Sequence, residues 1–153
     1  MRTVAAAQTF PATVAEAERR WFDTGRWDHW IDGLERVAAV EGPWPEPGSS
    51  VTWQSNPAGR GRVSERVVEH EPLRSQTLEV EDDSIRGRQS VTFTPVDGGV
   101  EITLTLAYEI KRRSPVTSLV DLLFIRRAMT SSLQTTVSRF GAELHSARAG
   151  VGS

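Results

Sequence analysis

The sequence predicts an α+β fold in which a strongly bent antiparallel sheet of seven strands wraps around one long C-terminal helix. Two observations support this prediction. Residues 100–110 alternate between large apolar side chains and side chains that are polar except at Ala107, which is typical of a strand with one buried face and one wet face. Residues 122–144 place apolar side chains three or four positions apart, the spacing of an amphipathic helix. The helix would cover the apolar face of the sheet.

The N-terminal part of the chain is expected to hold one strand and two short helices. Residues 2–10 alternate weakly and predict the strand. Thr13 and Glu16 have the spacing of a capping box, which predicts the start of a first helix that ends near residue 25. Apolar residues at helical spacing within 26–34 predict the second short helix.

Six strands should follow these helices, because turn residues divide the next part of the chain at regular intervals. Segments 42–48 and 56–61 are rich in proline and glycine, and Asp97-Gly98-Gly99 is a hairpin signal. The expected strands cover residues 35–41, 51–53, 63–67, 78–80, 85–94 and 100–110.

The long helix has a clear start signal. Ser114 is a natural N-cap and Pro115 is a natural first helical residue. No proline and only one glycine follow them before about residue 147. We therefore expect residues 1–147 to form a single domain and residues 148–153 to form a C-terminal tail.

Composition limits the classes of function. The 153-residue chain has no cysteine, which excludes disulfides and thiolate zinc sites, and its formal net charge of -2 gives no overall attraction to nucleic acid. No two histidines have the spacing of metal ligands and no nucleotide-binding motif is present, so we expect no metal, no cofactor and no nucleic acid partner. The N-terminus lacks the apolar core of a signal peptide, and no segment approaches membrane-spanning length. These features predict a cytoplasmic protein.

Four segments together resemble one known superfamily. They are Phe10-Pro-Ala-Thr-Val, Gly25-Arg-Trp-Asp-His-Trp-Ile-Asp-Gly-Leu, Gly61-Arg-Val-Ser-Glu-Arg-Val-Val-Glu-His-Glu-Pro, and the helix from Arg127-Ala-Met-Thr-Ser-Ser-Leu to Arg139-Phe. They resemble the START-related (SRPBCC) superfamily of helix-grip proteins, which includes the birch pollen allergen, polyketide cyclase-like proteins and coenzyme Q-binding proteins. The match runs over nearly the whole chain, but its motifs are structural and carry little information about function.

The resemblance implies a cavity between the sheet and the C-terminal helix, lined by apolar side chains and open toward loops. It implies a binding or carrier protein for a small hydrophobic molecule of the lipid, quinone or polyketide class. The alternative is an enzyme of the polyketide cyclase or dehydratase kind. The residues expected to contact the ligand are Trp30, Trp53, Glu65, Gln89, Phe93, Leu106, Tyr108, Met129, Leu133 and Val137.

Three residues are candidates for acid–base chemistry. Glu65 has the parity of its neighbouring inward-facing valines, so its carboxylate should point at the apolar interior, where burial raises a carboxyl pKa. Alternatively, a bulge or a rim position leaves it solvated. Tyr108 is either a general acid or ligand anchor, or a packed ring with its hydroxyl at the edge. His29 would be the histidine best placed for proton transfer if it faced inward, but its spacing from the flanking tryptophans favours the surface. Gln89 is either a ligand partner or a satisfied core amide.

The first half of the long helix is apolar on almost all sides. Residues 116–125 hold more apolar side chains than one sheet-facing stripe can bury, and basic residues at 111–113 and 126–127 flank them. One hypothesis is that this segment forms a homodimer contact or packs against a lid. The other is transient contact with a membrane. Asp121 argues against deep insertion and favours the first hypothesis.

Overall fold

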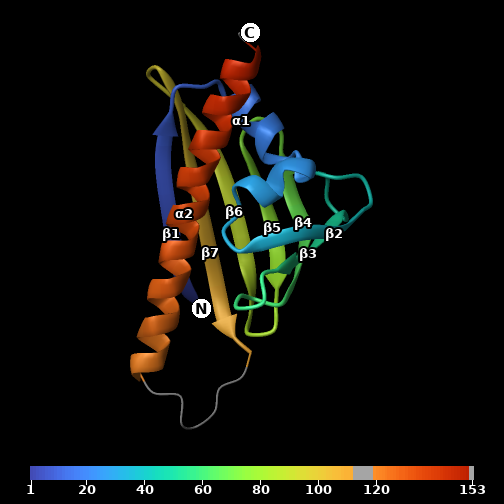
Figure 1. Cartoon of the computed structure of the whole chain (residues 1–153), viewed down its shortest axis with the longest axis vertical. Coiled ribbons are helices and arrows are strands. Elements are labelled where there is room, and N and C mark those ends of the chain that lie inside the picture. Colours follow the sequence, from blue (N-terminus) through green and yellow to red (C-terminus); the bar gives the residue numbers. More distant parts are fainter. Residues whose placement is uncertain (112–118, 152–153) are drawn as a thin grey trace.

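The computed structural model describes the backbone of residues 1–111 and 119–151 (Figure 1). One antiparallel sheet holds all seven strands, in the spatial order β1-β7-β6-β5-β4-β3-β2. The elements are β1 (Arg2–Phe10), α1 (Val14–Trp21), the 3-10 helix η1 (Thr24–His29), β2 (Leu34–Glu41), β3 (Ser50–Ser55), β4 (Arg62–Glu71), β5 (Ser75–Glu81), β6 (Ile85–Val96), β7 (Gly99–Ile110) and α2 (Leu119–Val151). This arrangement confirms the predicted helix-grip fold class.

The short helices begin where their capping residues predict. The Thr13 side chain accepts a hydrogen bond from the Glu16 backbone N–H at 3.1 Å and so caps α1. This helix ends at Trp21, earlier than expected, because the Asp23 side chain accepts from the Gly25 N–H at 3.2 Å and starts η1. The second short helix is thus a six-residue 3-10 helix that begins and ends before the predicted 26–34 segment does.

The core lies between the inner face of the sheet and α2. Strand β7 pairs with both β1 and β6, and its even-numbered residues from Val100 to Tyr108 are buried. Helix α2 packs over β1 and β7 (Figure 1) and buries four apolar side chains there. Burial of each such side chain stabilises the fold by roughly 1.5–3 kcal/mol before entropy is counted. The four helix residues are Leu133, Val137, Phe140 and Leu144.

Helix α2 extends further at its C-terminus than the sequence predicts. The predicted start at residues 114–115 lies outside the described residues. At the other end the helix continues to Val151, so residues 148–151, expected as a tail, are helical. Arg148 Nε lies 3.2 Å from Glu16 Oε2 of α1, and this ion pair holds the last turns of α2 against α1.

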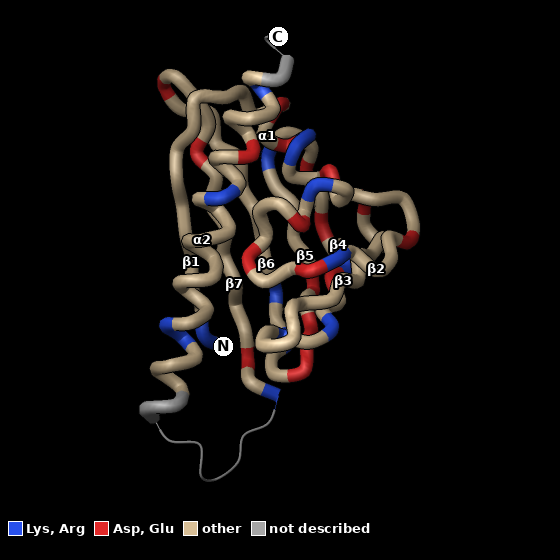
Figure 2. Tube along the Cα trace, in the orientation of Figure 1, with Lys and Arg blue, Asp and Glu red and all other residues tan. Residues whose placement is uncertain are grey.

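Exposed apolar residues mark the N-terminal half of α2. Leu123 is 54% exposed and Phe124 is 72% exposed, whereas Ile125 packs partly against the core. The remaining side chains of the predicted 116–125 patch, apart from that of Leu122, lie outside the described residues. Charges of both signs are interspersed along α1 and the sheet, whereas α2 carries few (Figure 2). Within the described parts of the chain, no helix is both long and apolar enough to span a membrane.

Candidate functional site

A single row of residues crosses the sheet at the end where β1 begins and β7 ends (Figure 1). The strand register aligns these residues, and their shared parity turns their side chains toward the same, inner face. From the β1 edge, the row comprises Arg2, Tyr108, Gly87, Val80, Glu65 and Val51. A Cβ at Gly87 would overlap the carbonyl oxygen of Ala107, so only glycine fits there. No side chain therefore projects from β6 in this row.

Glu65 is a buried carboxyl group in this row. Its in-register neighbours Val51 and Val80 are apolar, the residue is 5% exposed, and its Oε2 atom has no hydrogen-bond partner among the described residues. Burial raises the pKa of Glu65 to about 7, although the charge of Arg60 and the indole N–H of Trp53 both act to lower it. The Trp53 Nε1 atom approaches the carboxyl but makes no hydrogen bond of ordinary geometry. Glu65 can therefore exchange a proton near neutral pH.

Arg60 stands beside Glu65 and is held in place by Asp82. Arg60 Nε lies 2.6 Å from Asp82 Oδ2, and its guanidinium carbon lies 5.6 Å from the centroid of the Trp53 ring. Asp82 is also fixed, because its Oδ1 accepts from the backbone N–H groups of Ser84 at 2.7 Å and Ile85 at 2.9 Å. This arrangement leaves Arg60 Nη2 buried and without a partner among the described residues.

Tyr108 occupies the other side of the same row. It is fully buried, and its hydroxyl group has no hydrogen-bond partner in the described part of the chain. The neighbouring Arg2 Nε is likewise buried and unpartnered. A groove of about 580 Å³ opens here, and it is lined by Met1, Arg2, Tyr108, Glu109 and Ile110.

Unpartnered polar atoms are concentrated at this end of the molecule. Among the described residues, seven buried side-chain polar atoms lack a hydrogen-bond partner, and five of them lie in or beside this row. Folded proteins leave few buried polar atoms unpartnered, so each cluster of them needs an explanation. The five atoms are Arg2 Nε, Trp53 Nε1, Arg60 Nη2, Glu65 Oε2 and the Tyr108 hydroxyl.

The opposite end of the interior is filled by aromatic rings. Trp21 lies 4.6 Å from Trp30 and 4.8 Å from Phe140, measured between ring centroids, and Phe93 packs edge-on against Trp21 at 6.2 Å. Trp30 and Phe93, which were expected to contact a ligand, are therefore members of this packed cluster and lie away from Glu65. The pattern of apolar residues alone gave no signal that separates the two ends.

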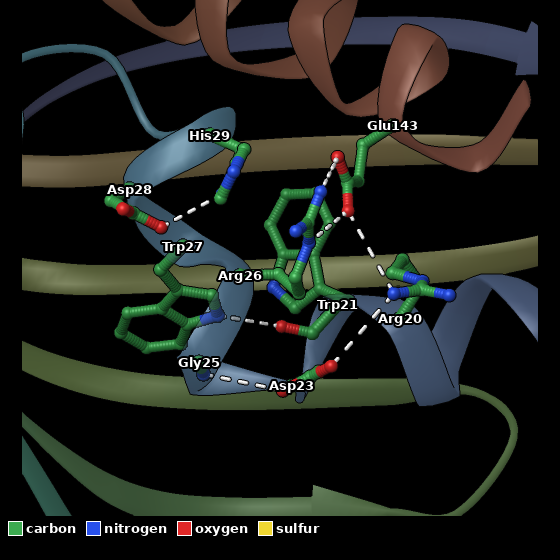
Figure 3. A network of polar contacts seen from close by, with 9 residues as sticks. All are labelled: Arg20, Trp21, Asp23, Gly25, Arg26, Trp27, Asp28, His29 and Glu143. Carbon is green, nitrogen blue, oxygen red and sulfur yellow. Dashed lines mark hydrogen bonds and ion pairs between the residues drawn. The ribbon is translucent and has the colours of Figure 1, made fainter. Parts of the chain in front are cut away.

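A polar network closes the aromatic end (Figure 3). Arg26 donates to Glu143 from Nε at 2.8 Å and from Nη2 at 3.3 Å, and Arg20 Nη1 lies 3.7 Å from the same carboxylate. The hydrogen bond from Arg26 holds the pKa of Glu143 below its usual value. Glu143 was not among the sequence candidates. Its position three residues after Phe140, on the buried face of the helix, was the signal that could have identified it.

The remaining candidates lie in three different environments. The His29 side chain is 46% exposed, and its Nδ1 lies 2.8 Å from Asp28 Oδ1 (Figure 3). It belongs to η1, at the aromatic end of the interior, whereas Glu65 and Tyr108 lie in the row at the other end. Gln89 is half-buried in the middle of the sheet, where it pairs in register with Leu106. On α2, Leu133 and Val137 are buried and Met129 is half-buried against the core. No cluster of side chains suited to holding a metal ion occurs among the described residues.

Comparison with known proteins gives a consistent result. A family model described as polyketide cyclase/dehydrase and lipid transport matches residues 1–145. No curated protein sequence matches the chain significantly. Many solved structures match it.

Three of these structures illustrate the range of proteins that share the fold. The protein TTHA0849 of Thermus thermophilus superposes with a TM-score of 0.73 at 18% identity, over 95% of this chain and 99% of that one. The di-domain ARO/CYC protein StfQ of the steffimycin biosynthetic pathway gives 0.78 at 16% identity, over 97% of this chain and 51% of its own length. Ara h 8.0201 gives 0.68 at 12% identity, over 95% and 98% of the two chains. Identities this low show a shared fold alone.

Proposed function

The chain belongs to the polyketide cyclase/dehydrase and lipid transport family, and we propose that it binds a small, mainly apolar molecule between its sheet and α2. Membership of this family confirms the resemblance that the sequence indicates. The proposed binding region is the end of the interior that holds Glu65 and Tyr108. The observation that supports it is the group of unpartnered polar atoms on an otherwise apolar face.

The energetics favour an occupant at this place. Each buried polar atom without a hydrogen-bond partner costs about 1–3 kcal/mol, so several of them side by side are unfavourable in a purely structural role. A ligand with oxygen atoms would satisfy them. Its apolar part would lie on the buried aliphatic side chains around Glu65, namely Val51, Val63, Val80 and Ile85.

The groove beside Tyr108 suggests a route of entry. The aromatic cluster and the Arg26–Glu143 ion pair close one end. The groove beside Tyr108 opens at the other end, next to the unpartnered atoms of Arg2 and Tyr108. We propose that the ligand enters through this groove.

A cyclase or dehydratase activity is the second candidate, because the pKa of Glu65 lies near 7, the range a general acid or base needs. Tyr108 and Glu65 share a row, but three strand spacings separate them, which amounts to about 14 Å along the sheet. They are better suited to contact two ends of one ligand, which favours binding over concerted acid–base catalysis.

The test combines native mass spectrometry of freshly purified protein with thermal shifts measured against fatty acids, sterols, quinones and polyketides. We expect at least one of these classes to be retained or to raise the Tm. Tyr108→Phe should leave the Tm of the free protein unchanged or slightly higher, because it removes an unpartnered hydroxyl, and should reduce the ligand-induced shift. Thr105→Val, on the other face of β7, is the matched control. If no class binds and no bound mass appears, the proposed function is wrong.

A further inference from the structure

The polar groups around Glu65 are mostly hydrogen-bond donors. Trp53 Nε1 and Arg60 Nη2 are both buried and unpartnered among the described residues, and neither group can accept a hydrogen bond. Asp82 accepts from Arg60 Nε at Oδ2 and from two backbone N–H groups at Oδ1, and it makes no hydrogen bond with Arg60 Nη2. Two donors, one of them on a cation, therefore lie close to one buried carboxyl.

Glu65 completes this set in its protonated form. A protonated carboxyl donates one hydrogen bond, so three donors would then lie close together in an apolar surrounding. A neutral hydroxyl or carbonyl oxygen would leave part of this capacity unused. A carboxylate brings two oxygens and a negative charge, and charge-assisted hydrogen bonds to it are the strong ones.

We infer that the interior selects apolar molecules that carry a carboxylate, held by Trp53, Arg60 and protonated Glu65, and that it releases them when Glu65 loses its proton. This inference rests on the proposed function and adds to it a ligand class and a means of release. Ionised Glu65 would place a negative charge beside the carboxylate of the ligand, and like charges at short range oppose binding.

The charged and titratable groups near Glu65 are consistent with binding when Glu65 is protonated and release when it is ionised. The turn between β3 and β4 supplies Arg60, and the turn between β5 and β6 supplies Asp82, whose charge Arg60 offsets. The strands on either side of Glu65 present Val51 and Val80 in register with it.

The next groups lie further away. The same row ends in Tyr108 and Arg2, and the charged residues in the first turns of α2 with described side chains, Arg126 and Arg127, are exposed. Lys111 forms an ion pair with Glu81 and donates a hydrogen bond to the backbone carbonyl of Asp82. Since the pKa of Glu65 is about 7, the change in affinity should fall near neutral pH.

The experiment compares two probes that differ only in charge: dansylaminoundecanoic acid and its methyl ester, titrated by fluorescence at about pH 6 and about pH 8.5. A group with a pKa of about 7 is only ~3% protonated at the higher pH, so the acid should bind roughly 30-fold more weakly there. The ester should bind equally at both pH values. Binding of the acid with no pH dependence, or binding of the ester alone, overturns the inference and leaves the proposed function intact.

Two variants assign the effect to these residues. Glu65→Gln keeps a donor and cannot ionise, so it should bind the acid with nearly the same affinity at both pH values. Trp53→Phe removes one hydrogen-bond donor and should weaken binding of the acid more than binding of the ester. Glu69→Gln, an exposed position on the same strand, should behave as wild type.

Persistence of the pH dependence in Glu65→Gln would show that another group is responsible and would overturn the assignment. Binding of neither probe also overturns the inference, and the ligand panel described above then decides separately on the proposed function.

Discussion

Arg26 and Glu143, 117 residues apart in the chain, form a two-point ion pair that fastens η1 to the C-terminal half of α2. The other buried glutamate of the interior, Glu65, has the opposite environment, with a carboxyl oxygen unpartnered among the described residues and a raised pKa. The pKa values of the two carboxyl groups shift in opposite directions, because the hydrogen bond from Arg26 dominates for Glu143 and desolvation dominates for Glu65. Each carboxyl group leads to a separate prediction about the stability of the folded protein.

Glu143→Gln should lower the Tm by about 2–4 °C at neutral pH, since it removes the charge that Arg26 and Arg20 approach. The pKa of Glu143 is lowered in the folded state, so its contribution is present above the unfolded pKa and is lost as pH falls through the folded pKa. The difference between wild type and variant should therefore disappear in acid. Thermal melts across pH check this. Glu109→Gln, which removes an exposed pair with Arg86, should have almost no effect.

Glu65→Gln should stabilise the free protein at alkaline pH. The pKa of Glu65 is raised from 4.5 to about 7, so between these values the unfolded chain has lost a proton that the folded chain keeps, and stability falls as pH rises. Above pH 7 the penalty is complete, at about 3 kcal/mol as an upper limit. Urea unfolding at acidic and alkaline pH measures it. Equal stability of the two proteins at alkaline pH would show that Glu65 has a partner or is solvated.

Gly141→Ala should destabilise the protein, although alanine is the better helix former by about 1 kcal/mol. A Cβ at this position would overlap the ring of Phe10, which packs from β1 against α2. We expect the clash to outweigh the gain in helix propensity and to cost about 1–2 kcal/mol net. In a Phe10→Ala background the same change should become stabilising, and chemical unfolding of the four variants tests this coupling. Additive effects would contradict the contact.

Leu123→Asp should lower the sedimentation coefficient measured at matched concentration, because we expect the first half of α2 to mediate self-association. The prediction follows from the exposed apolar side chains of Leu123 and Phe124. Val40→Asp, at an exposed apolar position on β2, is the control and should not change the sedimentation. If wild type and Leu123→Asp sediment alike at every concentration, the patch does not drive self-association. Vesicle co-sedimentation then tests the alternative, membrane contact.

Local patterns were sufficient to predict most of the fold. The alternation in β7 and the capping box at Thr13 lie within short stretches, so the physics that sets them is visible in the sequence. The 3-10 form of η1 was not predictable, because it depends on how tightly Asp23 turns the chain after α1. The C-terminal end of α2 was also missed; Arg148 there pairs with Glu16 of α1, a contact between segments far apart in the sequence.

The candidate site was predictable only in part. Parity places Glu65 and Tyr108 on the inner face, and the structure has both there. Arg60 could not be identified in this way, because it lies in a turn. Its position beside Glu65 depends on its ion pair with Asp82, 22 residues away. Likewise, nothing local distinguishes Trp53, beside Glu65, from Trp30 in the aromatic cluster. Contacts between distant segments decide both cases.

The aromatic cluster and the row that holds Glu65 lie at opposite ends of one interior, and this separation has an evolutionary consequence. The rings around Trp21 and the ion pair of Glu143 secure the fold at one end. Substitutions at the other end that remove an unpartnered polar group and keep the shape of the side chain, such as Tyr108→Phe or Glu65→Gln, should therefore cost little stability, and some should even increase it. Descendants of such a chain can acquire new ligands by changing a few inward-facing side chains, while the framework that keeps them folded is inherited intact.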